Sequence, residues 1–163
     1  MGSTLAALMA VEVIEHRLHI NASPASVWAA ISDPRRYAEW AVNTLQVLDV
    51  SGDLAEAGAT YHQRNRIAGP LTGTSRWKVT TFEPPHRAVH RGEGIWVAQW
   101  MELEMIVDVD GDGTQYTHRF SYEPAFGPAG SVMNVLLKRS VAHDMGRTAQ
   151  ALKALCELET NFL

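Results

Sequence analysis

The chain has 163 residues, of which 46% are hydrophobic and 20% are charged, and its formal net charge at pH 7 is −4. A chain of this length fits one domain that buries about two-thirds of its unfolded surface, so we expect no second domain. Because the net charge is negative, the chain has no overall positive potential to attract nucleic acid, which argues against a nucleic-acid partner. The single cysteine, Cys156, excludes an internal disulfide and favours a buried thiol, in keeping with a cytoplasmic location.

Residues 1–10 come before the first expected strand, and an apolar run extends from Leu5 to Val11. This run is too short to cross a bilayer, and it lacks the positive residues that precede the core of a signal peptide. We therefore expect an N-terminal extension over residues 1–10, a single domain over residues 11–160, and no integral membrane segment.

A first strand is expected over Val11–Ile20, and the residues after it carry the signals of two short helices. Pro24 suits the first turn of a helix, where its missing N–H costs nothing. Asp33-Pro34 ends that helix after about two turns, because the residue before a proline avoids the α region. Tyr37 and Trp40 then share one face of a second short helix. Helices this short are stable only when they pack on something larger.

Six further strands are expected, each bounded by turn residues, over Leu45–Val50, Ala59–Ile67, Leu71–Phe82, His86–Gly94, Val97–Val109 and Thr114–Glu123. Residues Ser131–Glu159 contain no proline and one glycine, which indicates a single helix of about eight turns. An antiparallel sheet can bury one face against such a helix, and a curved sheet that grips a helix leaves a gap between the two. The pattern predicts an α+β fold with that gap as its functional site.

The order of these signals resembles the START-like superfamily, also called Bet v 1-like or SRPBCC, and within it the branch of polyketide cyclase/dehydrase and lipid-transport proteins. The resemblance covers residues 11–159 and implies a helix-grip fold: a seven-stranded curved antiparallel sheet wrapped around a long C-terminal helix, with two short helices after the first strand. This superfamily hosts binders and enzymes on one scaffold. The matching residues are Ala22, Ser23-Pro24, Val27-Trp28, Asp33, Trp40, the strand and Pro-Pro corner at Trp77–Pro85, and Gly113-Thr114.

The expected inner surface is rich in aromatic and methionine side chains and carries a few polar ones. Rings and thioethers adapt to the shape of a ligand, while a few hydrogen-bonding groups fix its orientation. We therefore expect a cavity for a small hydrophobic ligand, such as a lipid, a polyketide or a similar metabolite. A solid core is the alternative, and its polar members would need internal partners. The expected lining is Trp40, Tyr61, Gln63, Asn65, Trp77, Trp96, Met101, Met105, Tyr116, Phe120, Met133, Leu137, Val141 and Met145.

His118, Tyr122 and Arg91 are the candidates for chemistry. His118 alternates with aromatic residues on an inward strand face, and an imidazole that titrates near neutrality can move protons or orient a ligand. A satisfied core histidine is the alternative. Cyclases of the resembled branch steer the enolisation and dehydration of a poly-β-ketone, which implies that role for His118 and Tyr122, helped by Arg91. Arg91 can equally form an exposed ion pair.

Three functions are open at this stage: a ligand-binding protein, a polyketide cyclase/dehydrase, and a protein-interaction module. The third would use the outer sheet face, where His62, Arg64 and Arg66 alternate with the inward residues. The sequence contains no H-E-x-x-H motif, and no glycine-rich phosphate loop follows a strand. We expect no metal, no cofactor, and a monomer or weak dimer.

Overall fold

Seven antiparallel strands form one sheet in the order β1-β7-β6-β5-β4-β3-β2. The computed structural model describes residues 11–52, 56–127 and 130–161, so the expected N-terminal extension lies outside the described part. The elements are β1 (Glu12–Ile20), α1 (Pro24–Ile31), the 3-10 helix η1 (Pro34–Arg36), α2 (Tyr37–Trp40), β2 (Thr44–Ser51), β3 (Thr60–Ala68), β4 (Leu71–Glu83), β5 (Arg87–Glu93), β6 (Ala98–Asp110), β7 (Gly113–Pro124) and α3 (Ser131–Thr160).

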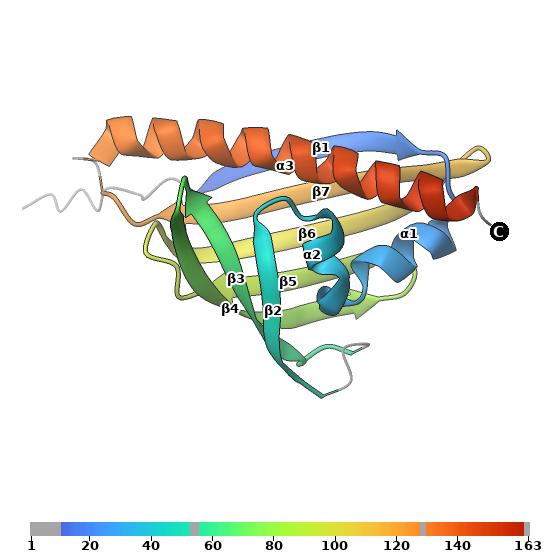
Figure 1. Ribbon diagram of the computed structural model, residues 1–163, viewed down its shortest axis with the longest axis horizontal. Helices are drawn as coiled ribbons and strands as arrows, with labels where there is room; N and C mark the ends of the chain where they lie inside the picture. The colour runs from blue at the N-terminus through green and yellow to red at the C-terminus, as the bar shows by residue number, and fades with distance from the viewer. Residues whose placement is uncertain (1–10, 53–55, 128–129, 162–163) are drawn as a thin grey trace, which may run out of the picture.

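The predicted helix-grip architecture is confirmed. Figure 1 shows α3 lying lengthwise over the sheet, with β1 and β7 beside it and with β2, β3 and β4 curving away below. The two short helices α1 and α2 pack against α3 as well as against the sheet. This arrangement leaves a space that is bounded by the inner sheet face, α2 and α3.

Local capping explains where the short helices begin. The Ser23 side chain accepts a hydrogen bond from the backbone N–H of Ser26 at 3.2 Å, which satisfies one of the free donors at the start of α1. The Asp33 carboxylate does the same for η1, accepting from the backbone N–H of Arg35 at 3.0 Å. Val27 and Ile31 on α1 are fully buried, so the packing predicted for these short helices is present.

The two halves of α3 are packed differently. Along its second half, Met145, Ala149, Leu152 and Cys156 are all buried against the sheet and α1. Along its first half burial is less complete, since Leu137 and Val141 are half-buried and Met133 is 50% exposed. The buried thiol predicted for Cys156 is confirmed, and burial raises its pKa to about 11.

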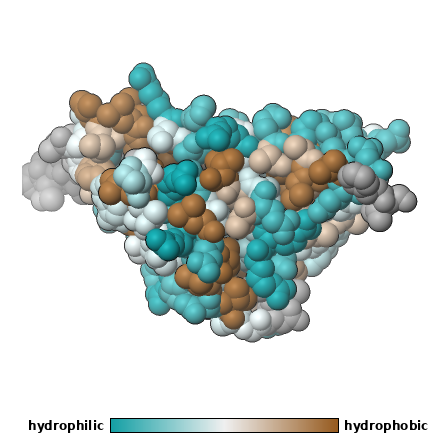
Figure 2. Space-filling view, viewed as in Figure 1, coloured by the Kyte–Doolittle hydropathy of each residue, from teal (hydrophilic) through white to brown (hydrophobic). Residues whose placement is uncertain are grey.

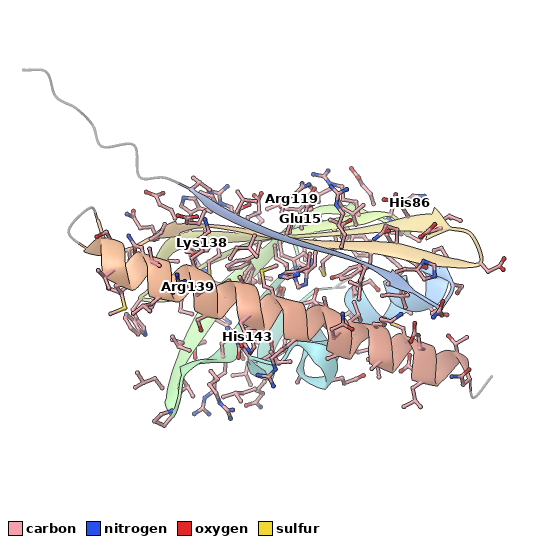
Figure 3. The ribbon with its side chains drawn as sticks, turned by 90° about the horizontal axis from the view of Figure 1, so that it is seen from above. Glu15, His86, Arg119, Lys138, Arg139 and His143 are labelled. Carbon is pink, nitrogen blue, oxygen red and sulfur yellow. The ribbon has the colours of Figure 1, made fainter. Side chains whose placement is uncertain are left out.

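The outer face of the sheet is covered by linked ion pairs. Glu15 on β1 pairs with Arg119 on β7 at 2.7 Å, and Arg119 continues to Glu104 on β6 at 2.5 Å. Glu104 also pairs with Arg87 on β5 at 2.7 Å, so one network crosses four strands. Figure 3 shows Glu15 and Arg119 together on the side of the sheet away from α3.

Candidate functional site: a cavity between the sheet and the last helix

A cavity of about 200 Å³ lies between the inner sheet face and α3, and it is partly open to solvent. Its lining comes from α2, from α3, from strands β2, β3, β4, β6 and β7, and from the segments before β2 and between β5 and β6. The structure brings most of the sequence-predicted site residues into this lining, namely Trp40, Gln63, Asn65, Trp77, Met101, His118, Phe120, Tyr122, Leu137, Val141 and Met145.

Five expected lining residues are placed elsewhere. Tyr61, Met105 and Tyr116 are fully buried, but they lie in the core around the cavity rather than in its wall. Trp96 and Met133 point outward and are 57% and 50% exposed. Alternation along a strand had placed the first three on the correct face, but it does not say how far along that face the cavity extends.

Arg91 lies on the outer face of β5, away from the cavity. Its neighbour Gly92 faces inward opposite Trp77 on β4 and Met101 on β6, so Arg91 alternates to the other side. There the Arg91 guanidinium stacks 4.8 Å from the centre of the Trp100 ring and lies 3.8 Å from Glu102. This arrangement gives Arg91 no contact with a molecule in the cavity.

Gly92 makes room for the aromatic wall of the cavity. A Cβ atom at this position would lie only 2.8 Å from the Trp77 ring, too close for any other residue without movement of the indole. Trp77 in turn packs against the Tyr61 ring, with ring centroids 6.4 Å apart and nearly parallel planes. A side chain at residue 92 would therefore displace one wall of the cavity.

A hydrogen-bonded network of polar side chains forms one end of the cavity. The Gln63 amide donates to the Thr44 hydroxyl at 2.5 Å and to the Asn65 side-chain oxygen at 2.8 Å. Asn65 donates to the Ser75 hydroxyl at 3.0 Å, and the Trp77 indole donates to the same oxygen at 2.8 Å. The polar groups at this end are therefore held in fixed positions by one another.

His118 and Tyr122 differ from that network, because polar atoms in both are buried without a partner. His118 Nδ1 and the Tyr122 hydroxyl make no hydrogen bond within the described part of the chain, although both residues line the cavity. An unsatisfied buried polar group costs about 1–3 kcal/mol, so such groups call for an explanation. A bound molecule that supplies the missing hydrogen-bond partners is one such explanation.

Burial sets the protonation states of these two groups. Desolvation, reinforced by the positive form of His16 across the strand pair, lowers the pKa of His118 to about 4. Desolvation and the nearby Glu12 carboxylate raise the pKa of Tyr122 to about 12. Near pH 7 the cavity therefore presents a neutral imidazole and a protonated phenol.

Sequence reasoning missed several members of the lining. Tyr37, Asn43 and Asp144 are the clearest, and the Asn43 amide donates to the Asp144 carboxylate at 2.8 Å in the cavity lining. Asp144 could not be found from the sequence, because helical spacing alone does not distinguish a charged side chain that lines a cavity from one in open solvent. Tyr37 could have been found, because its predicted helix face also carries Trp40.

The fold and the cavity together define a helix-grip protein with an internal cavity. The family described as polyketide cyclase / dehydrase and lipid transport matches residues 12–157, and the chain belongs to this family. No curated protein sequence matches the chain.

Solved structures share the fold at low sequence identity. The Zhui aromatase/cyclase from Streptomyces sp. R1128 has a TM-score of 0.75 and 19% identity, over 91% of this chain and 94% of that one. A START superfamily protein from Mycobacterium smegmatis has a TM-score of 0.73 and 15% identity, over 90% of this chain and 97% of that one. The di-domain ARO/CYC StfQ of the steffimycin biosynthetic pathway has a TM-score of 0.76 and 11% identity, over 94% of this chain and 53% of that one. No helix in the described residues is both long and apolar enough to cross a bilayer.

Proposed function

We propose that the cavity binds one small, mostly apolar molecule that carries polar groups at two separate points. The observation that carries this proposal is the pair of buried, unpartnered groups, His118 Nδ1 and the Tyr122 hydroxyl, in the wall of an apolar cavity. The network around Gln63 and Asn65 satisfies its own donors, so it does not need a ligand in the same way.

The spacing of these two groups restricts the ligand. His118 and Tyr122 are four residues apart on one face of β7, which places their Cα atoms about 13 Å from each other. Phe120 lies between them on the same face, so the middle of the ligand meets an apolar surface. An extended or fused-ring molecule with a hydroxyl or carbonyl group toward each end fits this pattern.

Charge restricts the ligand further. Both groups are neutral near pH 7, since the pKa of His118 is about 4 and that of Tyr122 is about 12. A neutral imidazole and a phenol can share hydrogen bonds with hydroxyl and carbonyl groups, but they offer no charge to balance a buried carboxylate. Beside His118 and Tyr122 the proposal therefore favours neutral ligand groups over anionic ones.

Fused-ring probes of graded polarity test this proposal. Quenching of tryptophan fluorescence would measure the binding of naphthalene, 2-naphthol and 2,6-dihydroxynaphthalene, because Trp40 and Trp77 line the cavity. Each satisfied hydroxyl should tighten binding by about fivefold, and Tyr122→Phe should remove one such step. Leu137→Trp should block binding, while Leu136→Trp, whose side chain is 54% exposed, should not. Equal affinity for the three probes, or unchanged binding by Leu137→Trp, would contradict the proposal.

A cyclase/dehydrase activity is the second candidate, and the same two groups favour it. His118 would remove a proton from a methylene between two carbonyls, while the Tyr122 hydroxyl would donate a hydrogen bond to a carbonyl oxygen elsewhere on the poly-β-ketone. Products formed from a linear poly-β-ketone thioester, followed by mass spectrometry, would test it. His118→Gln should abolish turnover while keeping naphthol affinity, and an unchanged product profile would exclude this role.

A further inference from the structure

Exposed apolar side chains gather around the mouth of the cavity. We call this group the apolar rim, and it consists of Leu71, Trp96, Phe126, Val132, Met133 and Leu136. All except Phe126 are at least 50% exposed, and Val132 reaches 74%. Figure 2 shows hydrophobic surface at the end of the molecule where α3 begins. Contiguous exposed apolar patches of this kind mark interaction sites on soluble domains.

Contacts link the segments of the rim into one surface. Trp96, between β5 and β6, packs edge-on against Phe126 with ring centroids 6.0 Å apart. The Asn134 side chain on α3 donates to the Phe126 carbonyl oxygen at 2.7 Å, which ties the helix to the same loop. The β3–β4 hairpin joins through Gly73, whose missing side chain would meet both Ile67 and Ile95.

The rim borders the cavity mouth directly. Ile67, Ile95 and Leu137 line the cavity, and each lies in the same segment as a rim residue. A molecule entering or leaving the cavity on this side would pass between the β3–β4 hairpin, the β5–β6 loop and the first half of α3. The rim is therefore the surface at which the cavity meets its surroundings.

The charge around the rim is opposite in sign to that of the chain. The three segments that form it, residues 64–73, 94–99 and 125–140, contain Arg64, Arg66, Lys138 and Arg139 and no acidic residue, although the net charge of the chain is −4. Lys138 pairs with Glu12 at 2.5 Å. Figure 3 shows Lys138 and Arg139 on the first half of α3. Within the described residues, Arg64, Arg66 and Arg139 form no ion pair.

We propose that the apolar rim docks onto an anionic lipid bilayer, so that the cavity mouth opens against the membrane surface. An interfacial contact needs an apolar face, flanking cations and an aromatic side chain at the boundary, and the rim supplies all three. A protein partner would instead require a shape-matched interface with a regular supply of hydrogen bonds. The exposed side chains of the rim are hydrocarbon apart from the Trp96 indole and the Met133 thioether. The proposal names the place from which a ligand is taken up or to which it is delivered.

Vesicle flotation with the full chain tests this proposal. Binding is expected to vesicles of phosphatidylcholine mixed with phosphatidylglycerol, and much less to phosphatidylcholine alone. Trp96→Glu and Leu136→Glu should each weaken binding roughly tenfold or more, through lost apolar burial and added negative charge. Arg66→Gln and Arg139→Gln should each weaken it by about fivefold, and added salt should weaken it as well.

Matched controls separate docking through the apolar rim from non-specific binding to vesicles. Val109→Glu changes a side chain that is 73% exposed at the opposite end of the molecule, and Lys78→Gln removes an exposed cation from the outer face of β4. Neither should alter vesicle binding. Leu137→Trp, which fills the cavity, should still bind vesicles, so the docking proposal and the ligand proposal can fail separately.

Four results would overturn the docking proposal. The first is the absence of binding to the anionic vesicles, and the second is equal binding to neutral and anionic vesicles. The third is an oligomer in light scattering that Trp96→Glu dissociates, which would assign the rim to a contact between copies. The fourth is vesicle binding only after removal of residues 1–10, which would make that segment the natural occupant of the rim.

Discussion

Two fully buried tyrosines, Tyr61 and Tyr116, provide a matched pair for the energetics of the core. The Tyr61 hydroxyl hydrogen-bonds His90 Nδ1 at 2.8 Å, whereas the Tyr116 hydroxyl has no partner among the described residues. Burial raises the pKa of both phenols well above the usual value, so both remain protonated. Their rings are equally inaccessible to water. The difference between them is therefore the hydrogen bond.

Removing each hydroxyl should have opposite consequences. Tyr61→Phe should lower the free energy of unfolding by about 1–3 kcal/mol, because it leaves the His90 nitrogen buried and unpaired. Tyr116→Phe should be neutral or slightly stabilising, because it removes a polar group that has no partner. Urea unfolding of both variants measures the difference. A loss from Tyr116→Phe as large as that from Tyr61→Phe would contradict the hydrogen-bond assignment.

At the residue scale, sequence patterns predict the face of a side chain better than its depth. Strand alternation placed Met101, Phe120 and Tyr122 in the cavity wall, and it placed Met105 and Tyr116 on the same inner face. The two sets differ only in how far they lie along β6 and β7 from the segment that α3 leaves uncovered. That distance depends on the packing of a helix remote in sequence, so a period of two residues carries no information about it.

At the scale of an element, α3 combines a firmly packed half with a loosely packed one. Leu152 is fully buried, whereas Leu136, on the same helix, is 54% exposed. Leu152→Ala should cost about 2–5 kcal/mol of unfolding free energy, while Leu136→Ala should cost less than about 0.5 kcal/mol. Differential scanning calorimetry of the two variants would measure this. Similar losses at both positions would contradict the packing described here.

Hydrogen exchange should show the same asymmetry in α3. Amides in the first half of the helix should exchange faster than those near Leu152, because few buried contacts hold that half in place. A molecule in the cavity contacts Leu137 and Val141, so 2,6-dihydroxynaphthalene should slow exchange in the first half. Uniform exchange along α3, unchanged by the probe, would argue against a helix that responds to the ligand.

The boundaries of the elements follow closely from local signals in the sequence. Each of the seven strands and α3 begins and ends within two residues of its expected position, and α1 begins at the expected Pro24, because proline, glycine and aspartate act on their own backbone. The start of α3 differs from the expected lining, since Met133 was expected to face the cavity and is 50% exposed. Helical period identifies a face, but it does not show where the partner sheet ends.

At the scale of the whole molecule, two buried histidines make stability depend on pH. Burial lowers the pKa of His90 and of His118 to about 4, while each takes up a proton near pH 6.5 when the chain unfolds. Between these values the unfolded state binds more protons, so stability falls as the pH drops from about 6.5 to 4. Above about pH 6.5 both states are neutral at these residues, and they contribute no pH dependence.

Urea unfolding over that pH range tests the histidine contribution. Each histidine should remove up to roughly 3 kcal/mol by pH 4, and His118→Phe should make the decline shallower. His86→Gln alters an exposed histidine and should leave the profile unchanged. The same unfolding free energy at pH 7 and pH 5 would contradict the buried, neutral state assigned to both side chains.

Native mass spectrometry of the freshly purified full chain, alone and after incubation with 2,6-dihydroxynaphthalene, shows whether one small molecule occupies the space between the sheet and α3. One added molecule per chain is expected, retained by Leu136→Trp and lost from Leu137→Trp. A chain that carries no added mass and takes up none of the probe, or an adduct that survives Leu137→Trp, would contradict it.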